Sequence, residues 1–176
     1  QNEYETFIIL ADLHTLTTKP EKEAIQKIES NVRDLMLDYL SVGIDPKKVV
    51  FYRQSQIPEV TYLYLLFSML VTKSRLERMP TLKEVMRDLN IESVSLGLLS
   101  YPVLQAADIL MVRANLVPVG KDQESHVELT REIAQKFNQM YSPVFPEPEA
   151  LIGNESATLV GTDGKAKMSK SLGNCI

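Results

Sequence analysis

Thr6-Phe7-Ile8-Ile9-Leu10-Ala11 is the stretch of sequence that decides the fold. It is a short and continuous apolar run, which is typical of a buried strand. A second such run, Val49-Val50-Phe51-Tyr52, follows a segment at residues 20–43 in which apolar residues recur at helical spacing. Strand, helix and strand in this order predict a βαβ unit, and therefore an α/β fold with a parallel sheet.

The chain after the second run is expected to be mainly helical. A very apolar helix is predicted at residues 58–73. Its Tyr62, Tyr64 and Phe67 are interpreted as core or as subunit contact rather than as a ligand site. The charged, turn-like segment at residues 75–83 is interpreted either as a solvated connector or as a functional segment.

Residues 95–111 form a weakly polar stretch that is also predicted to be a helix. Within it Tyr101, Gln105 and Asp108 are spaced by four and three residues, which aligns them on one helix face. Apolar residues flank Asp108, so its carboxylate is expected to be buried and to need a partner. A structural hydrogen bond to a neighbouring backbone group is one interpretation. A ligand pocket that contains all three side chains is the interpretation we prefer.

Two turns at the carboxyl ends of predicted strands are further candidates for ligand contacts. Asp12-Leu13-His14-Thr15 follows the first apolar run, at the edge where open parallel sheets place their ligands. His14 is interpreted either as a surface residue or as a functional one. Gly120-Lys121-Asp122-Gln123 follows a predicted strand at residues 116–119, and its glycine lets backbone N–H groups approach a bound anion or ribose. The helix predicted after this turn has an apolar face made of Leu129, Ile133, Phe137 and Met140.

Lys167-Met168-Ser169-Lys170-Ser171 is predicted to be an exposed basic loop, because turn residues lie on both sides of it. Its two ammonium groups and two hydroxyl groups suit a polyanion whose charge changes during a reaction, such as a triphosphate. A solvated basic turn without a ligand is the alternative interpretation.

The composition predicts a cytoplasmic protein of one domain. The 176 residues are 44% apolar and 24% charged, which is ordinary for a soluble globular protein. A net charge of −4 argues against a surface that broadly coats nucleic acid. The single cysteine, Cys175, excludes an intrachain disulfide and fits a reducing compartment. The longest apolar run, at residues 62–71, is too short to span a membrane.

Six stretches resemble, in the same order, the tryptophanyl-tRNA synthetases of bacterial type, and the resemblance covers nearly the whole chain. Three short stretches come first: Leu10-Ala11-Asp12-Leu13-His14, Val42-Gly43-Ile44-Asp45-Pro46 and Leu76-Glu77-Arg78-Met79. Three specific stretches follow: Gly97-Leu98-Leu99-Ser100-Tyr101-Pro102-Val103-Leu104-Gln105-Ala106-Ala107-Asp108-Ile109-Leu110, Val117-Pro118-Val119-Gly120-Lys121-Asp122-Gln123 and residues 167–171. The last of these resembles the signature loop of class I aminoacyl-tRNA synthetases, which closes over the ATP phosphates during amino-acid activation.

The resemblance implies a Rossmann-type parallel sheet with flanking helices and a helical connective insertion. It implies activation of tryptophan with ATP to tryptophanyl-adenylate, followed by transfer to tRNA(Trp). Mg²⁺ would be held mainly by the ATP phosphates, without a metal site on the protein. The full-length enzyme is expected to be a homodimer.

The resemblance also implies roles for individual residues. The residue that matches Asp108 accepts a hydrogen bond from the indole N–H, and a buried carboxylate complements that group because an indole offers one donor and no acceptor there. Residues matching Tyr101 and Gln123 hold the amino and carboxylate end of tryptophan. The implied tryptophan pocket is completed by His14, Gln105 and Val119. The implied ATP site consists of Gly120, Lys121, Asp122, Leu159, Lys167, Met168, Ser169, Lys170 and Ser171. Lys167 and Lys170 are the implied catalytic residues, because their charges would neutralise the phosphates as pyrophosphate leaves.

Two departures from the family pattern bear on this assignment. The HIGH-like stretch in an N-terminal glycine-rich loop and the helical domain that reads the anticodon are missing, so residues 1–176 are expected to be an internal part of a class I catalytic domain. Many bacterial relatives carry methionine at the position of Gln105, and the Tyr-x-x-x-Gln-x-x-Asp pattern also resembles tyrosyl-tRNA synthetases. The Gly120-Lys121-Asp122-Gln123 turn and the Glu77-Arg78-Met79 stretch favour tryptophan.

An alternative from a different class is a noncatalytic module that kept the fold and lost the chemistry. Three ligand-type turns and an intact lysine loop argue against it, because a scaffold has no use for them. A basic position that follows Lys83 in the family is Val85 here, so no catalytic lysine is assigned in that segment.

Overall fold

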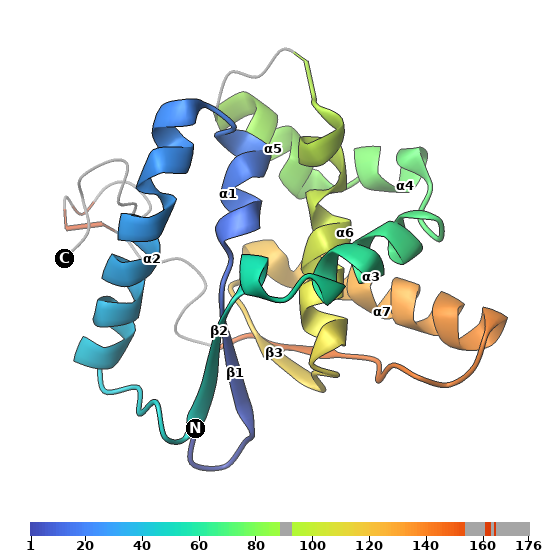
Figure 1. Cartoon of the computed structure of the whole chain (residues 1–176). Coiled ribbons are helices and arrows are strands. Elements are labelled where there is room, and N and C mark those ends of the chain that lie inside the picture. The colour runs from blue at the N-terminus through green and yellow to red at the C-terminus, as the bar shows by residue number, and fades with distance from the viewer. Residues whose placement is uncertain (89–92, 154–160, 163, 165–176) are drawn as a thin grey trace.

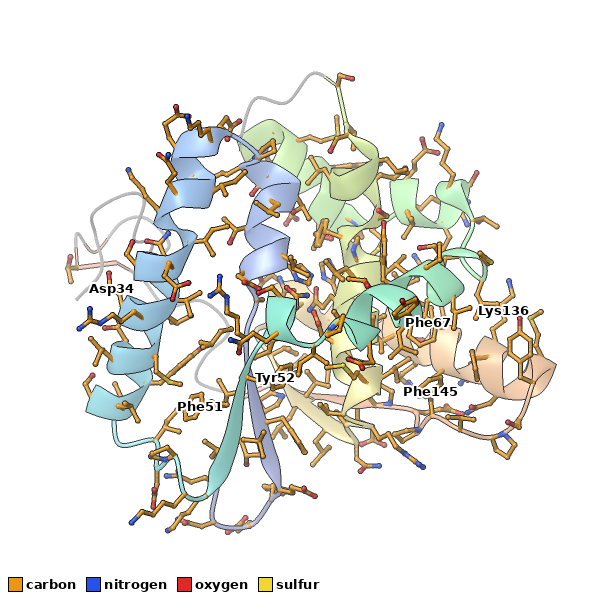
Figure 2. The ribbon with its side chains drawn as sticks, viewed as in Figure 1. Asp34, Phe51, Tyr52, Phe67, Lys136 and Phe145 are labelled. Carbon is orange, nitrogen blue, oxygen red and sulfur yellow. The ribbon has the colours of Figure 1, made fainter. Side chains whose placement is uncertain are left out.

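The predicted βαβ unit is present at the start of the chain. The structure, a computed structural model, describes residues 1–88, 93–153, 161, 162 and 164. Strands β1 (Thr6–Leu10) and β2 (Val49–Arg53) pair in parallel, with Thr6 opposite Val49 and Leu10 opposite Arg53. Helices α1 (Asp12–Thr18) and α2 (Lys22–Ser41) connect them, and α2 lies along one side of the pair (Figure 1). Phe51 of β2 faces α2, where its ring centroid is 6.0 Å from that of Tyr39 (Figure 2).

A second βαβ unit follows later in the chain. Strands β3 (Leu116–Pro118) and β4 (Glu149–Leu151) pair in parallel, and helix α7 (Glu124–Met140) lies between them in sequence. Strand β4 is not predicted from the sequence, because it has three residues and comes directly after a proline-rich loop. Within the described residues the two strand pairs do not hydrogen-bond to each other.

The centre of the molecule is helix α6 (Leu96–Met111), the predicted helix that carries Asp108. Ser95 caps it, since its hydroxyl oxygen accepts the N–H of Leu98 at 3.1 Å. Helices α3 (Glu59–Ser68) and α7 pack against α6 (Figure 1). The helices between the two strand pairs in the sequence correspond to the predicted helical insertion. Besides α3 and α6, they are the short 3₁₀ helix η1 (Gln54–Gln56), α4 (Lys73–Glu77) and α5 (Pro80–Asp88). A second 3₁₀ helix, η2 (Lys121–Gln123), follows β3.

Aromatic rings close the core between α3 and α7. The ring centroid of Phe67 lies 6.1 Å from that of Phe137 and 5.4 Å from that of Phe145, both in edge-on geometry (Figure 2). Leu129 and Ile133 are buried as predicted, whereas Met140, the last residue of α7, is exposed. The sequence therefore predicts the apolar face of α7 correctly except at its end.

The interpretation of residues 75–83 as a solvated connector is wrong. This segment contains most of α4 and the start of α5, and Leu76, Met79 and Leu82 are buried. They recur at a spacing of three from the end of α4 to the start of α5, while Glu77 and Arg78 between them are exposed. Arg75 adds a bidentate ion pair, because its guanidinium donates to both carboxylate oxygens of Glu132 at 2.9 and 2.7 Å.

One other local expectation needs correction. Asp12-Leu13-His14-Thr15 is not a turn but the first part of the seven-residue helix α1, which has no side-chain cap at its start.

The three aromatic residues of α3 have different environments. Phe67 is buried in the core, whereas Tyr62 is 68% exposed, so of the two interpretations only a subunit contact remains open for Tyr62. Tyr64 is partly buried, and its hydroxyl lies 2.6 Å from that of Ser100 on α6.

Candidate functional site

A buried polar cluster lies where the carboxyl ends of β1 and β2 meet helix α6. Gln54, the first residue after β2, is completely buried, and Asp108 of α6 is 6% exposed. The side-chain Nε2 of Gln54 donates to both oxygens of Asp108, at 3.0 Å to Oδ1 and 2.9 Å to Oδ2. The partner that the sequence predicted for Asp108 is therefore a side chain, and the backbone interpretation is wrong.

His14, on the first turns of α1, completes this cluster. Its Nδ1 lies 3.0 Å from Nε2 of Gln54 and 3.6 Å from Oδ2 of Asp108. The Oε1 of Gln54 accepts the backbone N–H of Leu13 at 3.1 Å. One glutamine side chain thus joins the start of α1 to α6, and His14 lies beside Asp108.

Burial dominates the electrostatics of the cluster. It raises the pKa of Asp108 to about 7, against an opposing effect of the hydrogen bond from Gln54. Burial also lowers the pKa of His14 below its ordinary value, and hydrogen bonds to Gln54 and to the backbone of Tyr101 oppose that shift. The pKa of Tyr52 on β2 rises to about 12 through burial and through the nearby charge of Asp108. Near neutral pH the His14 ring is neutral, so its contact with Asp108 is not a fixed ion pair.

A second network fixes the start of α1, which carries His14. Asp12 is buried and accepts hydrogen bonds from Nε of Arg53 at 2.6 Å and from both the hydroxyl and the backbone N–H of Ser55 at 2.6 and 3.0 Å. Burial alone would raise the pKa of Asp12, but the hydrogen bonds from Ser55 and Arg53 outweigh it and lower that pKa. Arg53 is held in turn by Glu29 of α2 at 2.5 Å.

The other predicted pocket residues of α6 contact α7 and η2. The hydroxyl of Tyr101 lies 2.9 Å from Nε2 of His126, a completely buried residue of α7. Burial lowers the pKa of His126 to about 4, so this ring is neutral near pH 7. Nε2 of Gln105 donates to Oε1 of Gln123 at 3.4 Å. Tyr101, Gln105 and Asp108 therefore each reach a polar residue of another element, in agreement with a shared polar face.

The glycine turn after β3 has a tight geometry. Nε2 of Gln123 donates to Oδ2 of Asp122 at 3.0 Å, and a Cβ added to Gly120 would lie 2.6 Å from the other oxygen of Asp122. Gly120 has an ordinary φ of −69°, so its backbone conformation is open to other residues, and a side chain there would only have to displace the carboxylate of Asp122. The backbone N–H of Val119 donates to the carbonyl of Leu151 at 3.1 Å, which extends the pairing of β3 with β4 up to the turn.

Several predicted site residues cannot be placed, and two polar residues were missed. Leu159 and the whole loop of Lys167, Met168, Ser169, Lys170 and Ser171 lie outside the described residues. Gln54 and His126 belong to no motif that the sequence shows. Gln54 follows β2 as closely as Asp12 follows β1, so the rule that drew attention to His14 applies to it as well. His126 stands three residues after Gln123, which is compatible with the same helical face.

Comparison with known proteins finds similar proteins along the whole chain. The family described as tRNA synthetases class I (W and Y) matches residues 1–176. A tryptophan–tRNA ligase of Treponema pallidum is 58% identical over 176 residues, which is 100% of this chain and 52% of that protein. A second, from Borreliella burgdorferi, is 55% identical over 177 residues, again 100% of this chain and 50% of that protein. The chain therefore spans about half the length of the curated relatives it matches.

Solved structures show the same fold. The tryptophanyl-tRNA synthetase of Campylobacter jejuni complexed with ADP and tryptophan superposes with a TM-score of 0.87 at 43% identity. The superposition covers 99% of this chain and 53% of that one. The prediction of a Rossmann-type α/β fold is confirmed, and so is the resemblance noted from the sequence motifs. Because the family model matches residues 1–176, which is the whole chain, the chain belongs to the class I tRNA synthetases (W and Y).

Proposed function

We propose that this chain supplies the amino-acid pocket of an enzyme that activates tryptophan with ATP and transfers it to tRNA(Trp). The observation that carries the proposal is the buried carboxylate of Asp108, held by Gln54 at 3.0 and 2.9 Å. A carboxylate has acceptor sites beyond those that Gln54 uses, and an indole N–H needs one acceptor. The names of the curated relatives favour tryptophan over the tyrosyl alternative.

His14 lies 3.6 Å from the carboxylate of Asp108, and we assign it to the same pocket. We also assign Tyr101, Gln105, Gln123 and Val119 to this pocket, because Tyr101 and Gln105 share helix α6 with Asp108 and Gln105 donates to Gln123. We assign the amino and carboxylate end of tryptophan to Tyr101 and Gln123. Their partners His126 and Gln105 are within 2.9 and 3.4 Å and would restrict their orientation.

We assign the ATP site to Gly120, Lys121 and Asp122, together with Leu159 and the loop from Lys167 to Ser171. In the proposed reaction a carboxylate oxygen of tryptophan attacks the α-phosphorus of ATP, and the bond from that phosphorus to the departing pyrophosphate breaks. No protein side chain acts as nucleophile, so positioning and charge stabilisation supply the catalysis. Mg²⁺ would arrive with the ATP phosphates, whose charge it neutralises.

Residues 1–176 are assigned to part of a catalytic domain, and the protein to the cytoplasm. The domain assignment rests on the family match over the whole chain together with a coverage of about half of each relative. The compartment rests on the single cysteine, Cys175, which fits a reducing environment. No helix among the described residues is long and apolar enough to cross a membrane.

Replacing Asp108 by alanine is expected to weaken tryptophan binding by about 1–3 kcal/mol, because the indole N–H then lacks an acceptor. Calorimetry on the full-length protein measures this, with Asp34→Ala as control, since Asp34 is an exposed aspartate of α2 far from the pocket (Figure 2). The parent protein should prefer tryptophan to tyrosine and phenylalanine. Equal or tighter binding of tyrosine would move the assignment to the tyrosyl branch, and no binding of tryptophan or ATP would favour a noncatalytic module.

We further propose that the full-length protein is a homodimer joined through the α3 outer face, defined here as Tyr62, Leu65, Leu66 and Met69. All four residues are exposed, from 49% for Leu66 to 72% for Met69. Their spacing places them on one stripe of the helix, and an exposed apolar stripe of this kind marks an interaction site.

Leu65→Glu is therefore expected to convert the dimer to a monomer, because the interface would bury an unpaired charge. Sedimentation of the full-length protein measures the mass. Leu37→Glu is the matched control, since Leu37 on α2 is exposed to the same extent as Leu65, 54% each. A dimer that survives Leu65→Glu would show that the subunits meet elsewhere.

A further inference from the structure

We propose that Gln54 is a positioning residue that determines specificity: its side-chain amide holds the Asp108 carboxylate as an acceptor for a ring N–H, and so selects indole over rings that lack this donor. This inference rests on the proposed function. Gln54 would act through Asp108 and need not touch the substrate itself.

The orientation of the Gln54 amide is fixed by its surroundings. Its Oε1 accepts the backbone N–H of Leu13 at 3.1 Å, and its Nε2 faces Asp108 and His14. Turning the amide over would place Oε1 against the carboxylate of Asp108 and Nε2 against the N–H of Leu13. Both contacts would then be repulsive, in a residue that is completely buried. The backbone N–H of Leu13 in α1 therefore fixes the orientation in which the Nε2 of Gln54 donates to Asp108.

Donation from Gln54 favours the charged form of Asp108. A hydrogen bond to a carboxylate lowers its pKa, whereas burial raises it, and for Asp108 burial is the larger effect, with a pKa of about 7. The titratable groups that face Asp108 from other elements are His14 of α1 and Tyr52 of β2. Neither replaces Gln54 as a donor: His14 is 3.6 Å away, beyond hydrogen-bond distance, and no hydrogen bond joins Tyr52 to Asp108 among the described residues. Without the amide, Asp108 would be protonated over a wider pH range.

Two consequences follow for ligand selection. An ionised carboxylate accepts an indole N–H more strongly than a protonated one, so loss of Gln54 weakens tryptophan binding. A tryptophan analogue whose ring N–H is replaced by sulfur, β-(3-benzothienyl)alanine, has nearly the same shape and offers no donor to Asp108. Its affinity should therefore be insensitive to Gln54. A residue with a purely structural role, by contrast, would affect both ligands alike.

The test uses Gln54→Met in the full-length protein, because methionine has a similar length and makes no comparable hydrogen bond. Calorimetry measures both ligands between pH 6 and pH 9. We expect tryptophan affinity to fall about ten- to a hundredfold near neutral pH, and the analogue to change by less than about threefold. In the parent, tryptophan affinity falls as pH decreases through the pKa of Asp108, and in the variant this fall begins at a higher pH. Gln56→Met, an exposed glutamine of the same 3₁₀ helix, is the control.

Gln54→Glu provides a second variant with nearly the same shape. It retains an acceptor for Leu13, but it places a carboxyl group against Asp108, and two adjacent carboxyl groups hold one proton between them. While the pair holds one proton, the introduced carboxyl group can donate it to Asp108 as the amide does, so this variant should keep more tryptophan affinity near neutral pH than Gln54→Met does. Equal losses for both ligands in Gln54→Met, or a loss of tryptophan affinity in Gln54→Glu as large as in Gln54→Met, would overturn the inference while the proposed function stands. A parent protein that does not bind tryptophan would instead overturn the proposed function and, with it, this inference.

Discussion

Lys167→Ala and Lys170→Ala should each slow ATP–pyrophosphate exchange by roughly 10²–10³-fold, the usual effect of removing one group that stabilises transition-state charge. Negative charge on the phosphates moves toward the leaving pyrophosphate as the α-phosphorus is attacked. Ammonium groups that meet this charge mainly in the transition state lower the barrier without tightening the binding of tryptophan. The exchange rate should therefore fall while the affinity for tryptophan hardly changes.

The measurement uses the full-length protein, because this chain spans about half the length of its curated relatives. Exchange rates are compared with tryptophan dissociation constants from calorimetry on the same preparations. Lys165→Ala is the control, a lysine two positions before the signature loop and not assigned a role. Parental exchange rates in both variants would mean that the loop is a solvated turn that does not contact the phosphates.

Asp108→Asn should stabilise the folded protein at high pH by about 4 kcal/mol and have little effect near pH 4. The pKa of Asp108 is about 7 in the folded protein and 3.8 as an ordinary value, so the folded state binds this proton more tightly. The stabilisation from the protonated group is complete below about pH 4 and is lost as pH rises through 7, at about 1.4 kcal/mol per unit of pKa difference. An asparagine does not ionise, so the variant avoids this loss. Urea denaturation at pH 4 and pH 8 measures both free energies of unfolding.

Asp12→Asn is the matched comparison, because Asp12 is equally buried but its pKa is lowered. Its ionised form is stabilised by Arg53 and Ser55, and that stability is lost as pH falls through the folded pKa. Asparagine at this position should therefore destabilise the protein at pH 8. The two substitutions are expected to have opposite signs, and a common sign would mean that the environment of Asp108 does not penalise its charge. A carboxylate at position 108 that costs stability at neutral pH is consistent with a role in ligand recognition.

The parts of the fold that the sequence predicts are those set by local pattern. The apolar runs of β1 and β2 and the helical spacing between them specify the first βαβ unit. The spacing of Tyr101, Gln105 and Asp108 likewise specifies a shared helix face, because three and four residues are close to one turn. Residues 75–83 were misinterpreted because the density of charge concealed a buried residue at every third position.

The candidate site depends on contacts that no local pattern specifies. Asp108 could be predicted to need a partner, but the partner lies 54 residues earlier in the chain and on another element. Glutamine is common after a strand, and the residues next to Gln54 in the sequence do not indicate whether its side chain is buried or exposed. Gln54 becomes recognisable only when the strand end, α1 and α6 are assembled around it. The same holds for His126, whose partner Tyr101 is 25 residues away.

The separation of the two strand pairs has a consequence for cooperativity. Within the described residues β1–β2 and β3–β4 share no backbone hydrogen bonds, and helix α6, which packs against both α1 and α7, connects the two βαβ units through side chains. His14 and Gln54 belong to the first unit, whereas Gln123 belongs to the second. A ligand that contacts residues of both units would couple the local unfolding of one unit to that of the other. Part of its binding free energy would then go into holding both units in the folded state. Substitutions far from the pocket could then change affinity by altering how readily one unit opens, without moving any atom that the ligand touches.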